Sequence, residues 1–329
     1  TNSNSSNSPY SLEMRNVSKT FPGVKALDQI NLRVKRGSVH ALMGENGAGK
    51  STLMKILYGI YIPDEGGELI LDDKPFKPGR PIDAIRRGLT MVPQEISPAA
   101  NLTIADNFYL GREITKGKFF LNQKAMNEQA SAILKELGVP MDVTEKMSDV
   151  SVAKAQLVAI ATAVSNDAKV IIMDEPTTAL TENEVDQLYR IIETVKARGI
   201  AIIFISHKLD EVFRVSDEIT VIRDGQYVDT KPTKEVTKEQ LISMMVGRDM
   251  SEMFQRERFE LSDEIVLEIK HFTREGKYQD INFAVRKGEI FGIAGLVGAG
   301  RSEIVEGLFG YKPADSGEIY IKGEKVVIN

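Results

Sequence analysis

Short apolar runs alternate with amphipathic stretches along this chain. Continuous apolar runs occupy residues 39–43, 170–173 and 200–205, which is typical of strands buried on both faces of a parallel sheet. The stretches 182–198 and 239–246 instead repeat their apolar positions at helical spacing, which predicts helices. Strands that alternate with helices in this way predict an α/β domain with a largely parallel, buried sheet.

Composition narrows the class of protein. With 329 residues, of which 42% are hydrophobic and 27% are charged, the chain has the size of about two globular domains. A net charge of −5 without a basic stripe argues against nucleic-acid binding. The absence of cysteine excludes disulfides and thiolate zinc sites, and no apolar run nears the roughly 18 residues of a membrane span. Residues 1–10 are rich in Ser and Asn and predict a disordered tail.

The chain also repeats itself. Residues 30–37 recur as residues 281–288, and a glycine-rich stretch at 44–51 recurs at 295–302, both 251 positions further along. Matches before this point have an offset of 255, so the second copy lacks four residues ahead of its glycine-rich stretch. The domains that this repeat predicts are a first domain at 11–250, a linker at 251–264 and the opening of a second, degenerate domain at 265–329, cut short in this chain.

The first glycine-rich stretch carries the most specific chemistry. Residues 44–52 are Gly-Glu-Asn-Gly-Ala-Gly-Lys-Ser-Thr and match the complete phosphate-binding pattern G-x-x-x-x-G-K-S between a strand and a helix. Its glycines let backbone N–H groups approach a polyphosphate at the N-terminus of the helix. Lys50 supplies a positive charge for the β- and γ-phosphates, and the Ser51 hydroxyl is a natural ligand for Mg²⁺.

Two carboxylates end the second apolar run. They belong to Asp174 and Glu175, and the ligands of parallel sheets lie at the carboxyl ends of the strands. We expect Asp174 to hold Mg²⁺, directly or through water, and Glu175 to act as the general base for a water that attacks the γ-phosphate. His207 follows the third apolar run, so we place it at the same sheet edge, in contact with the γ-phosphate. His40 is expected to be a packed strand residue.

Taken together, these motifs resemble the nucleotide-binding domain of an ABC transporter, and the resemblance covers essentially everything from Ser11 onward. In chain order the motifs are the phosphate loop, Gln94, the segment around Ser151, Asp174 with Glu175, and His207. A closer resemblance is to the tandem ATP-binding subunit of bacterial monosaccharide importers, the ribose and galactose type. The segments that carry it include residues 21–27, 44–50, 174–181 and 205–211.

The resemblance implies a P-loop ATPase fold with an antiparallel β portion and an α-helical insert at about residues 95–165, and it implies ATP and Mg²⁺ as cofactors. Phe21 would stack on adenine, and Gln94 would touch Mg²⁺ or the attacking water. Ser151 would act across a dimer interface on the nucleotide of the opposite domain. The implied nucleotide contacts are Phe21, Gly44, Glu45, Asn46, Gly47, Ala48, Gly49, Lys50, Ser51, Thr52 and Ser151. The implied metal ligands are Ser51, Gln94 and Asp174, and the implied catalytic residues are Lys50, Gln94, Glu175 and His207.

The sequence departs from this family at two places. Arg301 stands where the first loop has Lys50, and a planar guanidinium does not reproduce a compact ammonium. The family signature L-S-G-G-Q is Val150-Ser-Val-Ala-Lys here, so Ser151 is kept while Ala153 adds a methyl group where close approach is wanted. These two altered parts would face each other if the nucleotide-binding domains pair head to tail. We therefore expect one weakened composite site and one better site that uses the first loop.

The resemblance implies that ATP hydrolysis powers the import of a monosaccharide. The implied partners are two transmembrane permease subunits and, indirectly, an extracytoplasmic sugar-binding protein, with the chain at the cytoplasmic face of the plasma membrane and no nucleic acid bound. Two other functions stay open, a soluble ABC-type ATPase that acts on nucleic acid or ribosomes and a nucleotide-binding regulator without turnover. The chain has neither a sustained heptad run nor a basic linker that would favour the first of these, and the sequence does not identify the sugar.

Overall fold

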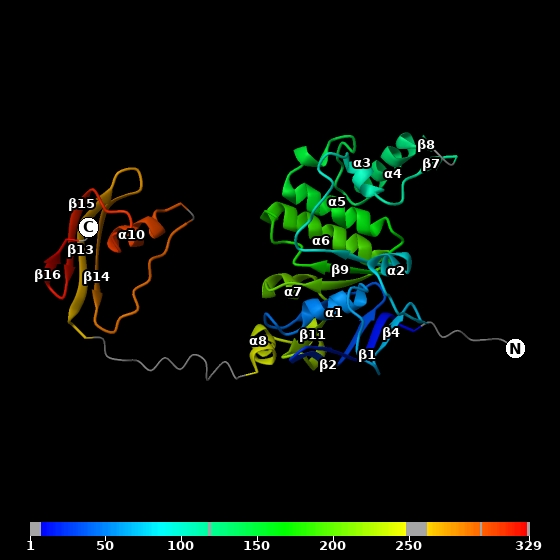
Figure 1. Ribbon diagram of the computed structural model, residues 1–329, viewed down its shortest axis with the longest axis horizontal. Coiled ribbons are helices and arrows are strands. Elements are labelled where there is room, and N and C mark those ends of the chain that lie inside the picture. Colours follow the sequence, from blue (N-terminus) through cyan, green and yellow to red (C-terminus); the bar gives the residue numbers. More distant parts are fainter. Residues whose placement is uncertain (1–7, 118–119, 248–261, 297, 328–329) are drawn as a thin grey trace. The chain divides into compact units, whose positions relative to one another are not determined.

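The computed structural model describes residues 8–117, 120–247, 262–296 and 298–327. The chain divides into two compact units, Thr1–Met253 and Phe254–Asn329 (Figure 1). Most of the predicted tail and linker, together with Arg248 and Val297, lies outside the described residues. Where the tail is described, the backbone carbonyl of Ser8 accepts a hydrogen bond from the Arg36 side chain.

Ten strands form the main sheet of the first unit. They are β1 (Tyr10–Phe21), β2 (Val24–Lys35), β3 (Val39–Met43), β4 (Glu68–Leu71), β5 (Lys74–Pro75), β6 (Leu89–Val92), β9 (Val170–Asp174), β10 (Ala201–Ile205), β11 (Glu218–Arg223) and β12 (Gln226–Pro232). Their order is β5-β4-β1-β2-β12-β11-β3-β10-β9-β6. The strands from β11 to β6 pair in parallel, whereas β1, β2, β4 and β5 pair antiparallel. The predicted parallel core sheet with an antiparallel portion is confirmed.

Helices cover both faces of the parallel strands. They are α1 (Lys50–Leu57), α2 (Pro81–Arg86), α3 (Ile104–Phe108), α4 (Gln123–Glu136), α5 (Val152–Val164), α6 (Glu182–Ala197), α7 (Leu209–Val215) and α8 (Lys238–Val246). The two helices predicted from periodicity are confirmed as α6 and α8. The expected insert at 95–165 contains α3, α4 and α5 with a short hairpin, β7 (Thr115–Lys116) and β8 (Phe120–Leu121). None of the helices in the described residues has the length and apolar character that crossing a membrane requires.

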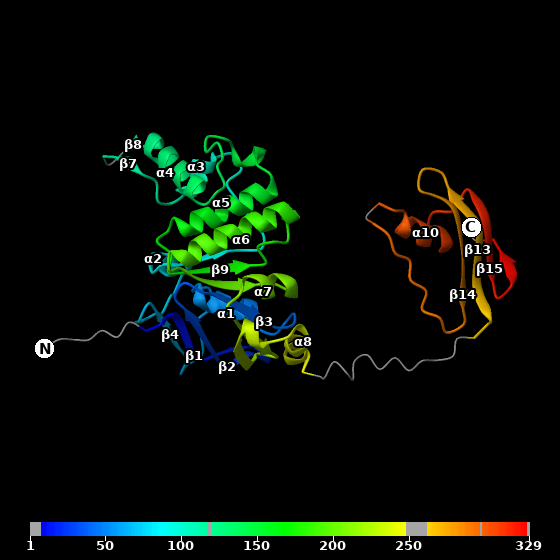
Figure 2. The same cartoon turned by 180° about the vertical axis from the view of Figure 1, so that it is seen from behind.

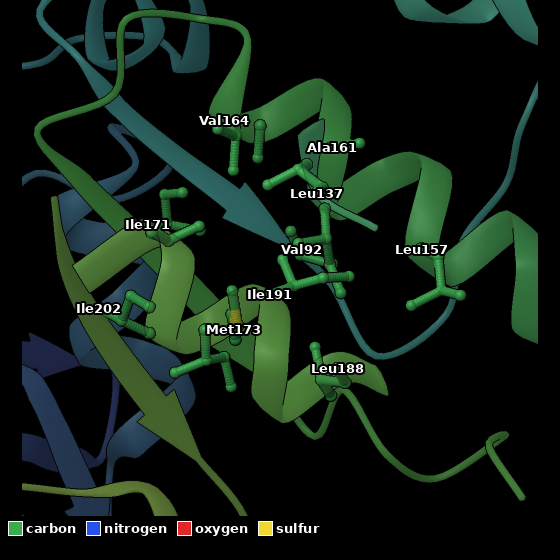
Figure 3. Close-up of a cluster of buried hydrophobic side chains, with 14 of the residues drawn as sticks. Val92, Leu137, Leu157, Ala161, Val164, Ile171, Met173, Leu188, Ile191 and Ile202 are labelled. Carbon is green, nitrogen blue, oxygen red and sulfur yellow. The ribbon is translucent and has the colours of Figure 1, made fainter. Parts of the chain in front are cut away.

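Two hydrophobic clusters fill the space on either side of the core strands, because alternate strand residues point to opposite faces. One cluster lies under α5 and α6, where Ile171, Met173 and Ile202 from the strands meet Leu157 and Ile191 from the helices (Figure 3). On the other face, α1 packs between the parallel strands and the antiparallel β1 and β2 (Figures 1 and 2). The helix that follows the phosphate loop is thereby fixed from both sides.

In the residues that the structure describes, the second unit is a four-stranded antiparallel sheet with one helix packed on it (Figure 2). Its elements are β13 (Ile265–Arg274), β14 (Tyr278–Arg286), α10 (Arg301–Leu308), β15 (Ser316–Ile321) and β16 (Glu324–Val326). They correspond in order to β1, β2, α1, β4 and β5 of the first unit. The core of this unit is small and is formed by Ile269, Phe272, Tyr278, Ile304 and Ile319.

The two copies share a hydrogen bond between their first two strands as well as sequence. The amide of Asn16 donates to Oδ1 of Asn31 at 3.1 Å, and the amide of His271 donates to Oδ1 of Asn282 at 2.7 Å. His271 lies 255 positions after Asn16, and Asn282 lies 251 positions after Asn31. The missing four residues therefore fall between these partners, in the turn that joins the first two strands of the copy.

One stretch behaves differently in the two copies. Residues 290–294 correspond to β3, yet they do not form a strand, and Ile290 is 89% exposed where the equivalent Val39 is buried. In the first unit β3 pairs with β10 and β11 on its two sides. The described part of the second unit contains no counterparts of these strands, and an apolar stretch without neighbours has no partners for its backbone groups.

His40 lies on β3 and is fully buried, so the prediction that it packs is confirmed. Its Nε2 lies 2.7 Å from Oγ1 of Thr220 on the neighbouring β11. Burial, and to a smaller extent the charge of Lys35, lowers the pKa of His40 from 6.5 to about 4. A neutral imidazole is therefore part of the folded core, and protonation should oppose folding.

Acid should destabilise the protein through His40. Below about pH 6.5 the unfolded chain takes up a proton that the folded protein does not bind until about pH 4. Between about pH 7.5 and about pH 5 this group alone should remove about 2 kcal/mol from the free energy of unfolding, measured by urea titration. The His40→Gln variant is the control and should lose about 2 kcal/mol less over the same range. Equal losses in both proteins would contradict the assignment.

Candidate functional site

The loop between β3 and α1 depends on its glycines. Gly47 and Gly49 have φ angles of 87° and 101°, in the left-handed region that favours glycine. A Cβ atom on Gly44 would lie 2.2 Å from the carbonyl oxygen of Ile222, and one on Gly49 would lie 2.6 Å from Cδ2 of Leu27. A Cβ on Gly47 would meet nothing within 4 Å, so this side of the loop is open. The loop therefore packs closely against Ile222 and Leu27 on one side and leaves space for a ligand beside Gly47.

Lys50 is the first residue of α1, and its ammonium is held by the loop. Nζ donates to the carbonyl oxygen of Gly44 at 2.7 Å and to that of Glu45 at 2.9 Å. Burial lowers the pKa of Lys50, while the charges of Asp174 and Glu175 act in the opposite direction. The first N–H groups of a helix lack intrahelical acceptors. The loop thus places one positive charge beside a group of free backbone donors.

The two carboxylates lie at the carboxyl end of β9. Asp174 is its last residue, and the amide of Glu175 donates to the carbonyl oxygen of Ile205 at the end of β10, at 2.8 Å. Burial raises the pKa of Asp174, the neighbouring Glu175 raises it further, and Lys50 lowers it. Because β9 and β10 are parallel neighbours in register, their ends meet at one sheet edge. Asp174 and Glu175 are therefore close enough to Lys50 for the charges to shift the pKa values of Lys50 and Asp174.

His207 follows the end of β10 and contacts one of these acids. Its Nδ1 lies 3.1 Å from Oε1 of Glu175, and 63% of the His207 side chain is exposed. The sequence-based placement of His207 at this sheet edge is confirmed. Its contact with the γ-phosphate of a nucleotide stays a prediction.

A cavity of about 280 Å³ opens at this edge of the sheet. It is lined by Ala26, Asn46, Gly47, Gly49, Lys50, Ser51, Thr52, Gln94, Asp174, Glu175 and Ile205. The fold therefore brings Gln94 and the two carboxylates to the phosphate loop, although they lie far apart in the sequence. Sequence reasoning missed two lining residues. Ala26 lies on β2 within the segment 21–27 that carries the closer resemblance, but it was given no site role, and Ile205 directly precedes the Ser-His pair that was singled out.

Other predicted site residues do not line the cavity. Phe21 ends β1, where its half-exposed ring meets Tyr61 edge-on at 5.2 Å between centroids. Ser151 caps α5, where its hydroxyl oxygen accepts a hydrogen bond from the amide of Lys154 at 3.3 Å. Also outside the lining are the loop residues Gly44, Glu45 and Ala48, and His207, which meets the cavity only through its contact with Glu175. Roles of Phe21 and Ser151 therefore need an extended ligand or a second domain.

The donors in the cavity fit a polyphosphate with Mg²⁺. The backbone N–H groups of the loop and the ammonium of Lys50 suit phosphate oxygens. Ser51, Gln94 and Asp174 provide oxygen atoms of the kind that Mg²⁺ prefers. Within the described ranges, no cluster of three or more His, Asp or Glu side chains could hold a metal by itself. This fits Mg²⁺, which usually keeps few protein ligands and binds substrate phosphates for the rest.

Comparison with known proteins identifies close relatives. Residues 27–178 match the family described as ABC transporter. The galactose/methyl galactoside import ATP-binding protein MglA of Mannheimia succiniciproducens is 49% identical over 315 residues, which cover 95% of this chain and 62% of that protein. The protein of the same name from Fusobacterium nucleatum is 48% identical over 322 residues, which cover 97% of this chain and 64% of that protein. The chain thus spans somewhat less than two thirds of the length of these relatives.

Solved structures give the same fold. The ADP conformation of MJ1267, described as an ATP-binding cassette of an ABC transporter, matches with a TM-score of 0.61 and 26% identity. The match covers 74% of this chain and 98% of that one. The P-loop ATPase fold expected from the sequence is confirmed.

Proposed function

Because the chain has the fold of an ABC ATP-binding cassette, we propose that it binds ATP with Mg²⁺ and hydrolyses it to power the import of a monosaccharide. The observation that carries the proposal is the cavity in which Lys50, Asp174 and Glu175 meet. Relatives that match almost the whole chain bear the name of galactose/methyl galactoside import ATP-binding proteins, which supports a sugar as the cargo.

The cavity residues divide the work of phosphoryl transfer. Lys50 binds the β- and γ-phosphates, and the loop amides bind the remaining phosphate oxygens. Ser51 and Asp174 hold Mg²⁺, which when bound neutralises charge on the phosphates. Glu175 orients the attacking water and accepts its proton, and Gln94 contacts that water or Mg²⁺ at the cavity wall. Phosphoryl transfer needs little more than the positioning of the water and the phosphates and the neutralisation of the phosphate charge. The residues that do this are attached to the phosphate loop, to α1 and to the ends of the core strands.

His207 and Phe21 complete the nucleotide site in this proposal. His207 contacts the γ-phosphate and also holds the carboxylate of Glu175. The distance between Nδ1 of His207 and Oε1 of Glu175 is 3.1 Å. Phe21 stacks on the adenine ring, and its own ring also makes an edge-on contact with Tyr61. Thr52, in the first turn of α1, contacts the α-phosphate.

We further propose that nucleotide-binding domains pair head to tail. Ser151 is exposed at the start of α5 and does not line the cavity of its own domain, as expected if it acts on the opposite one. The second unit supports a second copy of the domain, because α10 begins after the left-handed Gly300 just as α1 begins after the left-handed Gly49. Arg301 in place of Lys50 is what makes this copy degenerate in the proposal. The composite site that combines Arg301 with Ser151 should then be the weaker of two.

The proposed partners are two transmembrane permease subunits, which this chain would contact at the cytoplasmic face of the plasma membrane, with an extracytoplasmic sugar-binding protein acting through them. In proteoliposomes that contain the permease subunits, ATP turnover by this chain should rise when a galactose-loaded or ribose-loaded binding protein is added. Phosphate release is the measurement. Stimulation by DNA or ribosomes instead would favour a soluble ABC-type ATPase, and binding of Mg-ATP without turnover under any condition would favour a nucleotide-binding regulator.

A further inference from the structure

A buried carboxylate outside the cavity connects the loops that carry Glu175 and His207. Glu211 lies in the first turn of α7 and is only 8% exposed. Its Oε2 atom accepts a hydrogen bond from Oγ1 of Thr177 at 2.8 Å and another from Oγ of Ser206 at 3.0 Å. Both hydroxyl-bearing residues are buried as well. A single oxygen atom of α7 therefore joins the segment after β9 to the segment after β10.

The other oxygen of Glu211 is compensated by a cation. Nζ of Lys208 lies 3.1 Å from Oε1 of Glu211 and 3.5 Å from Oγ1 of Thr177. The amide of Lys208 donates to Oγ of Ser206 at 3.1 Å. A buried charge is tolerated when it is paired and hydrogen-bonded, and Glu211 meets both conditions. Its partners lie on the two loops and at the start of α7, so the network ties three segments together.

The network stands next to a backbone conformation that needs support. Glu175 has a φ of 45°, and a residue with a side chain holds such a conformation only where its surroundings fix it. Thr177 follows Glu175 by two residues, and Ser206 directly precedes His207. The hydroxyl groups that Glu211 fixes are thus within two residues of the side chains that meet in the 3.1 Å contact between Glu175 and His207.

We propose that Glu211 is a positioning residue that holds Glu175 and His207 in the arrangement needed for water activation. The inference rests on the proposed function, from which it takes the roles of these two side chains. Glu211 itself does not line the cavity, so it acts through the loops and not on the nucleotide. Its loss should reduce the rate of the chemical step and leave the phosphate-binding loop intact.

The Glu211→Gln variant tests this role, because the amide keeps the size of the side chain and removes its charge. We expect kcat for ATP to fall at least about tenfold, while the dissociation constant for ATP changes by less than about twofold. Asp210→Asn is the matched control on the same helix turn. Asp210 is exposed and paired with Lys238, so this variant should keep the parent kcat. The change Thr177→Val should add little to Glu211→Gln if the two residues act through one network.

A second measurement does not depend on turnover. The chain has three histidines, so the imidazole ring signals can be assigned in an NMR spectrum. We expect Glu211→Gln to move the His207 signal about as far as Glu175→Gln moves it, and Asp210→Asn to leave it in place. An unmoved His207 signal or an unchanged kcat in folded Glu211→Gln protein would overturn the inference. Absence of hydrolysis by the parent protein would instead count against the proposed function, and the His207 signal would still decide the role of Glu211.

Discussion

ATP turnover is expected to fall by at least about 100-fold when Glu175 is replaced by glutamine, with ATP affinity kept within about threefold. Glutamine has nearly the same shape but cannot accept a proton from the attacking water. Glu175 lines the cavity and contacts His207, so its carboxylate lies where a water beside the γ-phosphate would be activated. Because phosphate binding depends on the loop and not on this carboxylate, the variant should hold ATP without turning it over.

Turnover is measured by phosphate release, and affinity by titration with a fluorescent ATP analogue. Glu182→Gln is a suitable control, because it removes the same charge at a site away from the cavity. Glu182 is exposed and lies in the first turn of α6. Parent-like turnover in Glu175→Gln would exclude the general-base role and leave a binding module without this chemistry. Turnover lost equally in the Glu182 variant would point to a general charge effect.

The second large effect is expected on nucleotide binding. Replacing Lys50 by methionine should weaken ATP binding by about 10- to 100-fold, because a hydrogen bond to a charged group contributes about 1.5 to 3 kcal/mol. The parent ammonium is already held in place by two loop carbonyl oxygens, so little ordering is needed when phosphate binds. The same titration with a fluorescent analogue measures the loss.

Lys55→Met is the matched control for this experiment. Lys55 lies in the last turn of the same helix and is exposed, and its ammonium lies over the ring of Tyr61 instead of in the cavity. It should bind ATP as the parent does. If Lys50→Met also keeps parent-like affinity, the loop is not the phosphate site. Turnover that persists when Lys50 is disabled would show that the second loop with Arg301 is more active than we expect.

Several features of this protein follow from local sequence. The glycines of the phosphate loop predict left-handed turns and close packing, and the structure shows both at Gly49. The apolar runs predict buried parallel strands, which are β3, β9 and β10. The end of a parallel strand predicts the position of Asp174 at the sheet edge. Such inferences succeed because backbone geometry and strand burial depend on a few neighbouring residues.

The pairing of the site side chains depends on the packing of distant segments. The sequence predicts that Glu175 and His207 share a sheet edge, but the 3.1 Å contact between them depends on the register of β9 against β10. The same register, together with the docking of α7, places Glu211 between the two loops. Thr177, Ser206 and Glu211 lie in the segments 174–181 and 205–211 that carry the resemblance, but their spacing along the chain does not show that their side chains meet.

A comparison of the two copies of the repeat distinguishes what the local sequence determines from what only the tertiary structure determines. Their matching helix starts show that the local sequence determines the left-handed glycine before each helix. The fate of residues 39–43 and 290–294 was decided only by tertiary structure, since the first stretch is a buried strand and the second is not a strand. The physical reason is that a strand of a parallel sheet takes its hydrogen bonds from neighbours distant in sequence, whereas a turn or helix start takes them from residues nearby.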